Sequence, residues 1–127
     1  MSTELIATKR ILICDDDRDI LDVLNMLLTQ AGFEVLLANS HHELFNHFES
    51  GSPHLVLLDI RMPESDGFLT AETLRRRGHS VPIIFMSAHD NPFSRIYSSS
   101  VGASGYFKKP FDSGELLAKI QSVLSSS

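Results

Sequence analysis

Three consecutive carboxylates follow an apolar segment near the start of the chain, in the stretch ILICDDDRDI at residues 11–20. Asp15 and Asp16 come directly after this segment, and Asp59 comes directly after a second one, in the stretch HLVLLDIRMPESDG. Carboxylates held a few ångströms apart repel one another, so a cluster of them is stable only beside a cation. Their oxygens suit a hard divalent ion, and a small open set favours Mg²⁺ over Ca²⁺, which takes more ligands. If the fold brings them together, these residues predict a Mg²⁺ site.

Two further polar side chains follow apolar segments later in the chain. Ser87 comes after VPIIFM, and Lys109 comes after GYFK, immediately before Pro110. An aspartate can attack phosphorus to give an aspartyl phosphate. That transfer depends mainly on neutralising the oxygens of the phosphoryl group. Mg²⁺, the Lys109 ammonium and the Ser87 hydroxyl would supply this neutralisation, so the whole set indicates phosphoryl chemistry more specifically than any one member.

Some of the polar residues that follow apolar segments are expected to start helices. In the first turn of a helix, carboxylates and hydroxyls accept hydrogen bonds from free N–H groups, and we expect Asp17 to cap a helix in this way. Two later positions carry the paired residues of a capping box, Ser40 with Glu43 and Asp112 with Glu115. Local chemistry therefore marks these helix starts.

Short apolar segments alternate with segments of helical periodicity along the chain. The apolar segments cover residues 11–14, 33–38, 55–58, 81–86 and 105–107. Strict alternation of strand and helix, with strands apolar on both faces, predicts an α/β fold: a doubly wound, five-stranded parallel sheet with five helices. Ligands bind at the carboxyl ends of the strands in such sheets, so the polar residues after the strands are expected to meet on one rim.

The helix expected at residues 91–101 has the weakest sequence signal. Phe93, Ile96, Tyr97 and Val101 give it an apolar face, but the serines at 98–100 are poor helix formers. We expect this segment to be mobile.

Composition limits the classes of function that the chain can serve. A chain of 127 residues fits a single domain, with a core from about residue 9 to residue 124. Its formal net charge of −5 leaves no positive excess for a phosphate backbone, so no direct binding of nucleic acid is expected. The apolar segments are too short to span a membrane, and the first ten residues lack the apolar centre of a secretory signal. We expect a cytoplasmic protein that does not bind membranes.

The residues that follow the strands resemble the site of response-regulator receiver domains of two-component signalling, and the resemblance runs from about Lys9 to Leu124. It implies a flavodoxin-like fold with strand order 2-1-3-4-5, counted over the five main strands. It also implies a phosphoacceptor domain that takes a phosphoryl group from a histidine kinase or a histidine phosphotransfer protein in a Mg²⁺-dependent reaction. Such a domain is not an enzyme, because it assists only its own phosphorylation and dephosphorylation.

The resemblance assigns the acceptor and the metal ligands residue by residue. Asp59 corresponds to the phosphoacceptor. Asp15, Asp16 and Asp59 correspond to the carboxylates that hold Mg²⁺, and the backbone carbonyl of Arg61 corresponds to the remaining protein ligand. Met62, Pro63 and Gly67 match the loop after the acceptor.

The resemblance also assigns the residues that respond to phosphorylation. Ser87 corresponds to the switch hydroxyl, Lys109 to the phosphate-binding lysine and Tyr106 to the aromatic residue whose rotamer changes. The peptide bond between Lys109 and Pro110 is expected to be cis, as it often is in this family. Phosphorylation is then expected to change the surface formed by the strand at 81–86, the helix that follows it and the strand at 105–107.

Two variable positions lie beside the matched residues. Arg61 and His89 each come two residues after a matched site residue, where receivers tune the lifetime of the phosphoryl group. Our hypothesis is that both side chains lean over the acceptor and influence attack by water. The alternative is that both point into solvent.

Other functions are compatible with part of the pattern. The pair Asp15 and Asp17 resembles the nucleophile and acid of haloacid-dehalogenase-like phosphohydrolases, although Asp19 stands where that family usually has threonine or valine. A degenerate receiver that acts only as an interaction module is a further alternative. We expect no output domain in this chain, which would be a stand-alone regulator or a receiver from a larger protein such as a hybrid kinase. The downstream effector is unknown, and a homodimer is one option.

Overall fold

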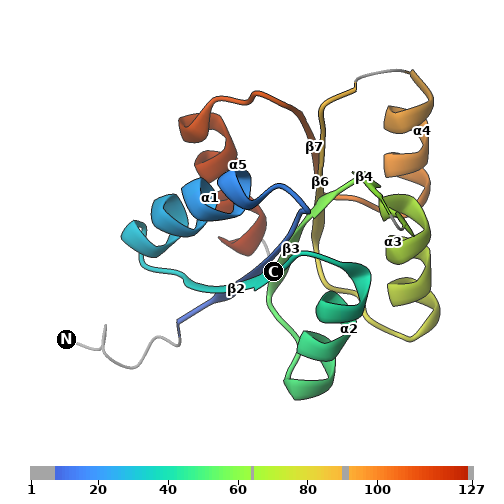
Figure 1. Ribbon diagram of the computed structural model, residues 1–127, viewed down its shortest axis with the longest axis horizontal. Coiled ribbons are helices and arrows are strands. Elements are labelled where there is room, and N and C mark those ends of the chain that lie inside the picture. The colour runs from blue at the N-terminus through green and yellow to red at the C-terminus, as the bar shows by residue number, and fades with distance from the viewer. Residues whose placement is uncertain (1–7, 64, 90–91, 126–127) are drawn as a thin grey trace.

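A parallel sheet forms the centre of the computed structural model, which describes residues 8–63, 65–89 and 92–125 (Figure 1). The strands lie in the order β2-β1-β3-β6-β7. Their bounds are β1 (Arg10–Cys14), β2 (Glu34–Ala38), β3 (Leu55–Asp59), β6 (Ile83–Ser87) and β7 (Gly105–Lys108). Every neighbouring pair is parallel. Counted over these five strands alone, the order along the chain is 2-1-3-4-5, so the predicted doubly wound sheet is confirmed.

A short antiparallel ribbon follows β3 and was not predicted. It consists of β4 (Arg61–Met62) and β5 (Ser65–Asp66), with Arg61 opposite Asp66. Strands of two residues are too short to show an alternating pattern, so the sequence gives no signal for them. The ribbon lies between the end of β3 and the start of α3, directly after Asp59 in the chain.

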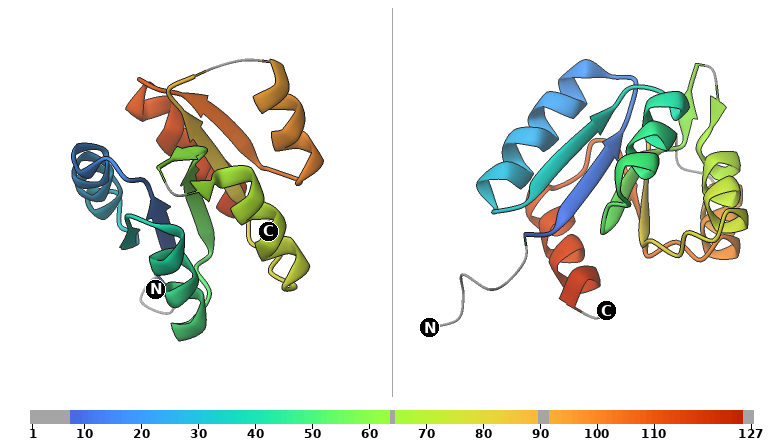
Figure 2. Two further views of the ribbon diagram at one scale, coloured as in Figure 1. Left: turned by 45° about the vertical axis from the view of Figure 1, so that its right-hand side comes forward. Right: turned by 90° about the horizontal axis from the view of Figure 1, so that it is seen from below.

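Helices cover both faces of the sheet (Figure 2). Their bounds are α1 (Arg18–Gln30), α2 (His41–Ser50), α3 (Gly67–Arg76), α4 (Pro92–Ser100) and α5 (Ser113–Ser125). The helices α1 and α5 pack on one face, whereas α2, α3 and α4 lie on the other. Within the described part of the chain, no helix is both long enough and apolar enough to cross a membrane.

The sheet is buried on both faces because successive side chains of a strand point to opposite sides. In β1, Ile11 and Ile13 pack beneath α1 and α5, whereas Leu12 and Cys14 pack beneath the helices of the other face. All four side chains are fully buried. Each fully buried leucine or isoleucine stabilises the fold by about 1.5–3 kcal/mol. This rigid sheet holds the ends of its strands in fixed positions.

The predicted caps are present at their helix starts. Asp17 accepts a hydrogen bond from the N–H two residues further on, at 2.9 Å. Ser40 Oγ accepts from the N–H of Glu43 at 3.2 Å, and the Glu43 carboxylate accepts from the N–H of Asn39 at 2.7 Å. Asp112 Oδ1 accepts from the N–H three residues further on, at 2.9 Å. The reciprocal bond of the first box therefore reaches one residue further back than the usual pattern.

The apolar face of α4 does not pack against the sheet. Phe93, Ile96 and Tyr97 are 72%, 64% and 53% exposed, whereas the buried residues of this helix are Ser94 and Ser98. The Ser98 hydroxyl donates to the carbonyl of Ser94 at 2.7 Å, so it needs no other partner when buried. The helix begins at Pro92. Residue 91, where we expected it to begin, lies outside the described residues.

A candidate metal and phosphoryl-transfer site

The carboxyl ends of β1 and β3 lie side by side and bring acidic side chains together. The two strands pair in parallel, with Cys14 opposite Leu58. Asp15 follows β1 directly, and Asp59 is the last residue of β3. One carboxylate oxygen each from Asp15, Asp16 and Asp59 lie within 4.8 Å of one another. The structure therefore places the predicted acidic residues on one rim.

Local hydrogen bonds fix the orientation of Asp15, whose side chain is fully buried. Its N–H donates to the carbonyl of Ala38 at 3.0 Å, which extends the pairing of β1 with β2 by one residue. Its Oδ1 accepts from the N–H of Asp17 at 2.9 Å. The other oxygen, Oδ2, faces Lys109. Asp17 itself caps α1.

Lys109 reaches the acidic cluster from the end of β7. Its Nζ lies 2.7 Å from Asp15 Oδ2 and 3.4 Å from Asp59 Oδ1. Its N–H donates to the carbonyl of Ser87 at 2.7 Å, which ties the segment after β7 to the end of β6. The predicted cis peptide bond between Lys109 and Pro110 is present. One ammonium group thus bridges the two buried carboxylates.

The single positive charge of Lys109 does not balance the cluster. Burial, together with the charge of Asp15, raises the pKa of Asp59 to about 7, although Lys109 and a hydrogen bond from the Arg61 backbone act in the opposite direction. Burial alone would lower the pKa of Lys109, but the hydrogen bond and charge of Asp15, with the charge of Asp59, raise it. The cluster therefore keeps an excess of negative charge, which a further cation would neutralise.

The donor set fits a hard divalent ion. All of its atoms are carboxylate oxygens, and among the described residues this group contains neither cysteine nor histidine. Asp15 and Asp59 are buried, whereas Asp16 is exposed, so the site opens to solvent on one side. An ion such as Mg²⁺, which keeps several water ligands, is suited to such an open site. The acidic cluster can hold a divalent cation of this kind.

Ser87 and Tyr106 share a hydrogen-bond acceptor, the backbone carbonyl of His89. The buried Ser87 hydroxyl donates to this carbonyl at 2.7 Å and accepts from the N–H of His89 at 3.0 Å. Tyr106 Oη donates to the same carbonyl at 3.2 Å. To donate to any other oxygen, the Ser87 hydroxyl has to leave His89. We call this set of bonds, from Ser87 and Tyr106 to the His89 carbonyl, the resting arrangement.

Close backbone packing makes Gly67 necessary beside Asp59. A Cβ atom at this position would lie 2.6 Å from the carbonyl oxygen of Asp59 and 2.8 Å from Cα of Ile60. The N–H of Gly67 also donates to the carbonyl of Ile60 at 2.8 Å. The start of α3 therefore presses directly on the backbone of the candidate acceptor. Only the family resemblance singled out this glycine, because its spacing alone carries no signal.

Arg95 is a residue at this end of the molecule that the sequence did not indicate. It lies on α4, and its Cζ is 4.6 Å from the centroid of the Tyr106 ring on β7. The two residues lie on different elements, a helix and a strand, so the spacing of residues along the chain does not predict their contact. The side chains of Arg61 and His89 are exposed, and their predicted effect on water stays a prediction.

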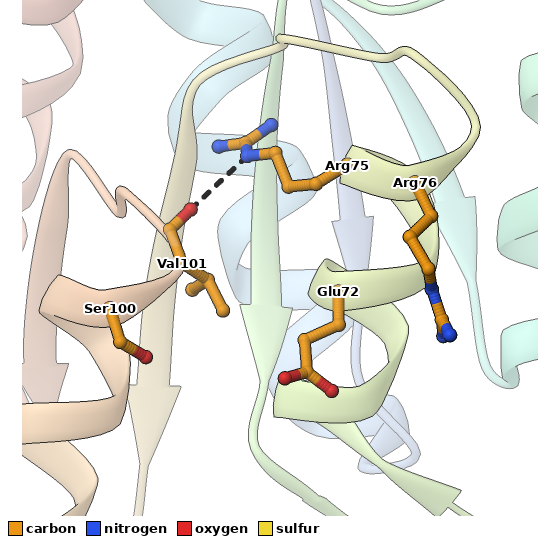
Figure 3. Close-up of a pocket in the computed structure, with 5 residues that line it drawn as sticks. All are labelled: Glu72, Arg75, Arg76, Ser100 and Val101. Atoms are coloured by element: carbon orange, nitrogen blue, oxygen red, sulfur yellow. Dashed lines mark hydrogen bonds between the residues drawn. The ribbon is translucent and has the colours of Figure 1, made fainter.

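A hollow of about 670 Å³ between α3 and α4 lies away from the acidic cluster (Figure 3). Its lining residues are Glu72, Arg75, Arg76, Ser100 and Val101. The Arg75 side chain donates from Nε to the carbonyl of Val101 at 3.1 Å and from Nη1 to the carbonyls of His79 and Val81. Arg75 therefore ties the far end of α3 to neighbouring loops.

Comparisons with known proteins identify a family that the chain matches. The response regulator receiver domain family matches residues 11–121. The chain is 34% identical over 114 residues to the response regulator protein GraR of Staphylococcus epidermidis, covering 90% of this chain and 50% of that protein. It is 35% identical, with the same coverage, to GraR of Staphylococcus aureus. The chain thus spans about half the length of these curated relatives.

Solved structures show the same fold. A CheY-like response regulator receiver domain protein from Methanospirillum hungatei superposes with a TM-score of 0.89 at 31% identity, covering 94% of this chain and 96% of that one. The Vibrio cholerae chemotaxis protein CheY4 gives a TM-score of 0.86 at 27% identity, covering 92% and 99%. Both likenesses extend over nearly the whole sheet and its helices.

Proposed function

The chain belongs to the response-regulator receiver domain family, and on this basis we propose that Asp59 is its phosphoacceptor. It is a signalling domain of two-component systems, for which the family implies a histidine kinase as partner. The phosphoryl donor in our proposal is a histidine kinase or a histidine phosphotransfer protein. One observation carries the assignment: Asp59 lies in the acidic cluster at the end of β3 with Oδ1 3.4 Å from Lys109, whereas Asp15 already uses one oxygen to accept from the N–H of Asp17 and the other to accept from Lys109.

In the proposed reaction, a carboxylate oxygen of Asp59 attacks the phosphorus atom of a phosphohistidine. The new O–P bond forms as the N–P bond breaks, and the electron pair of that bond returns to the imidazole. Lys109 neutralises negative charge on the phosphoryl oxygens, and it stands within reach because Asp15 orients its ammonium. Asp59 has to be ionised to react, so its raised pKa makes a neighbouring cation important.

We propose Mg²⁺ as that cation, held by Asp15, Asp16 and Asp59 with the backbone carbonyl of Arg61 as a further ligand. When bound, Mg²⁺ would neutralise charge on the carboxylates and on the incoming phosphoryl group. The oxygen-only donor set and its open side support this choice. Asp15 and Asp16 would then serve binding rather than covalent chemistry.

The proposed switch starts at Ser87. A phosphoryl group on Asp59 offers the Ser87 hydroxyl a charged acceptor, and a hydrogen bond to a charged oxygen is stronger than one to a carbonyl. The His89 carbonyl accepts hydrogen bonds from both Ser87 and Tyr106. When the Ser87 hydroxyl turns away, this carbonyl loses one of these two donors. Phosphorylation then shifts the population away from the resting arrangement and changes the surface of β6, α4 and β7. That surface would contact the downstream effector, or a second copy of the chain in a homodimer.

Arg61 and His89 are proposed to set the lifetime of the phosphoryl group. Each lies two residues beyond a site residue, and both side chains are exposed. The rate of loss of the phosphoryl group in Arg61→Ala and His89→Ala, compared with the unsubstituted chain, tests this. Unchanged rates in both variants would show that these side chains point only into solvent.

The experiment for the acceptor uses acetyl phosphate as donor and intact-mass spectrometry as readout. We expect one phosphoryl group per chain with Mg²⁺, and none with a chelator or in Asp59→Asn. Asp17→Asn is the matched control, because it removes a carboxylate that caps α1 and is next in the chain to the cluster. It should be phosphorylated normally. Persistence of the adduct in Asp59→Asn, or its loss in Asp17→Asn together with repeated turnover of a phosphate ester, would overturn the proposal.

A further inference from the structure

Tyr106 is held at both ends in the resting arrangement. Its hydroxyl donates to the His89 carbonyl at 3.2 Å, and its ring faces the Arg95 guanidinium, with 4.6 Å between Cζ and the ring centroid. This distance is within the range of about 6 Å over which a cation is attracted to an aromatic face. The tyrosine is therefore connected both to the loop after β6 and to α4.

The contact of Arg95 with Tyr106 matters because few apolar side chains hold α4 on the sheet. The helix turns two small polar side chains, Ser94 and Ser98, toward the sheet and leaves its large apolar residues exposed. Burial of a serine contributes little hydrophobic free energy, which scales with the apolar area removed from water. The position of α4 over β7 thus depends more than usual on specific side-chain contacts, such as that of Arg95 with Tyr106.

We propose that Arg95 is a positioning residue of the switch, which holds Tyr106 in the resting arrangement and links its release to α4. This inference depends on the proposed function, since it takes Asp59 as the acceptor and Tyr106 as the responding residue. When Ser87 turns to the phosphoryl group, Tyr106 changes its contact with His89, and the Arg95 contact opposes that change. Loss of the guanidinium therefore makes the switch easier to trigger.

The chemistry of arginine defines the variants. Its guanidinium is planar, permanently charged and able to stack on an aromatic face, whereas the lysine ammonium is a compact and strongly hydrated charge. Arg95→Lys keeps the charge and loses the planar stack. Arg95→Met keeps a long side chain and loses both. Because Arg95 is exposed, neither substitution opens a cavity in the core.

The chain contains a matched control for the same type of contact. Arg77, which follows α3, places its Cζ 4.5 Å from the ring centroid of Phe45 on α2. The distance from the cation to the ring is nearly the same as in the pair of Arg95 and Tyr106. It joins α2 to the end of α3, two elements that contribute no residue to the resting arrangement. Arg77→Met therefore removes an equal charge and an equal stack outside the switch.

The experiment uses Tyr106 itself as the probe. The chain has two tyrosines and no tryptophan, so Tyr97→Phe leaves Tyr106 as the only tyrosine emitter. In this background, tyrosine fluorescence is followed during titration with beryllofluoride at saturating Mg²⁺. We expect Arg95→Met to lower the half-saturating concentration by about two- to five-fold, the equivalent of one cation–π contact at an exposed site. Arg95→Lys should fall between Arg95→Met and the Tyr97→Phe chain, and Arg77→Met should not shift.

The outcomes separate this inference from the proposed function. If the Tyr97→Phe chain responds and Asp59→Asn abolishes the response, but Arg95→Met titrates like Arg77→Met or needs more beryllofluoride, the role of Arg95 is wrong. If the Tyr97→Phe chain shows no response, or the response survives Asp59→Asn, the proposed switch itself fails and the role of Arg95 fails with it. Thermal unfolding of each variant identifies any that do not fold. In that case Arg95→Lys, which keeps the charge, decides the question.

Discussion

The raised pKa of Asp59 predicts that the metal-free protein loses stability as the pH increases, and that Asp59→Asn removes this loss. In the folded chain the carboxyl lies 4% exposed, close to Asp15, and its pKa is about 7. In the unfolded chain it has the ordinary value near 3.9. The folded state therefore binds the proton more tightly than the unfolded state does.

The sign and the size of the effect follow from this difference. Below about pH 4 the group is protonated in both states and has no effect on stability. Between about pH 4 and 7 the free energy of unfolding falls by roughly 1.4 kcal/mol per pH unit, and above pH 7 it is constant. A shift of the Asp59 pKa from 3.8 to about 7 lowers the free energy of unfolding by about 4 kcal/mol in total. This loss comes from the burial of Asp59 itself as well as from its interaction with Asp15. Because a domain is stable by only about 5–15 kcal/mol, this loss is large.

The assay is urea unfolding followed by circular dichroism, at several pH values from 5 to about 8, in buffer with a chelator. Asp22→Asn is the control, because Asp22 is an exposed carboxylate on α1 outside the cluster. The difference in unfolding free energy between Asp59→Asn and Asp22→Asn should increase with pH and level off near pH 7. Addition of Mg²⁺ should reduce that difference, since the ion neutralises the carboxylates that repel one another.

A difference that does not change with pH would show that this explanation is wrong. It would mean that ionisation of Asp59 does not lower the free energy of unfolding. Lys109 alone would then neutralise enough of the negative charge of the cluster. A difference that increases with pH but is insensitive to Mg²⁺ would instead argue against a divalent ion between these carboxylates.

Two further predictions concern the residues packed around the acceptor. Gly67→Ala should lower the unfolding free energy by about 1–3 kcal/mol and slow phosphorylation, because the added Cβ atom would push on the Asp59 backbone. Thermal unfolding and the rate of phosphorylation by acetyl phosphate check this, and a variant as stable and as reactive as the unsubstituted chain would show that α3 moves to admit the methyl group. Lys109→Met should lower the unfolding free energy by about 3 kcal/mol at pH 8 without Mg²⁺, because Asp15 is left buried without its cation. Urea unfolding that shows no loss would mean that solvent already screens Asp15.

The sheet could be predicted from the sequence because each central strand contains four consecutive apolar residues. Strands buried on both faces, such as Leu55–Asp59 with every residue buried, have no polar alternation and stand out from the helices between them. The rim residues could be located for the same reason. A polar residue placed immediately after a buried strand has to lie at its carboxyl end, whatever the details of the loops.

The contacts made by α4 could not be predicted from periodicity. Its apolar residues repeat as in a helix, but hydrophobic spacing does not say which face of a short helix meets the sheet. Here Ser94 and Ser98 take the buried side, since Ser98 satisfies its own hydroxyl within the helix. The contact of Arg95 with Tyr106 and the close approach of Gly67 to Asp59 depend on tertiary packing alone.

The position of the phosphoryl group on the unsubstituted protein is the decisive test of the proposed acceptor. After reaction with acetyl phosphate and Mg²⁺, reduction with borohydride converts an aspartyl phosphate into a stable alcohol that survives digestion and peptide sequencing by mass spectrometry. We predict that the converted residue is Asp59, in the peptide that spans the end of β3. Conversion of Asp15 or Asp16, or of a carboxylate outside the acidic cluster, would contradict the assignment of Asp59.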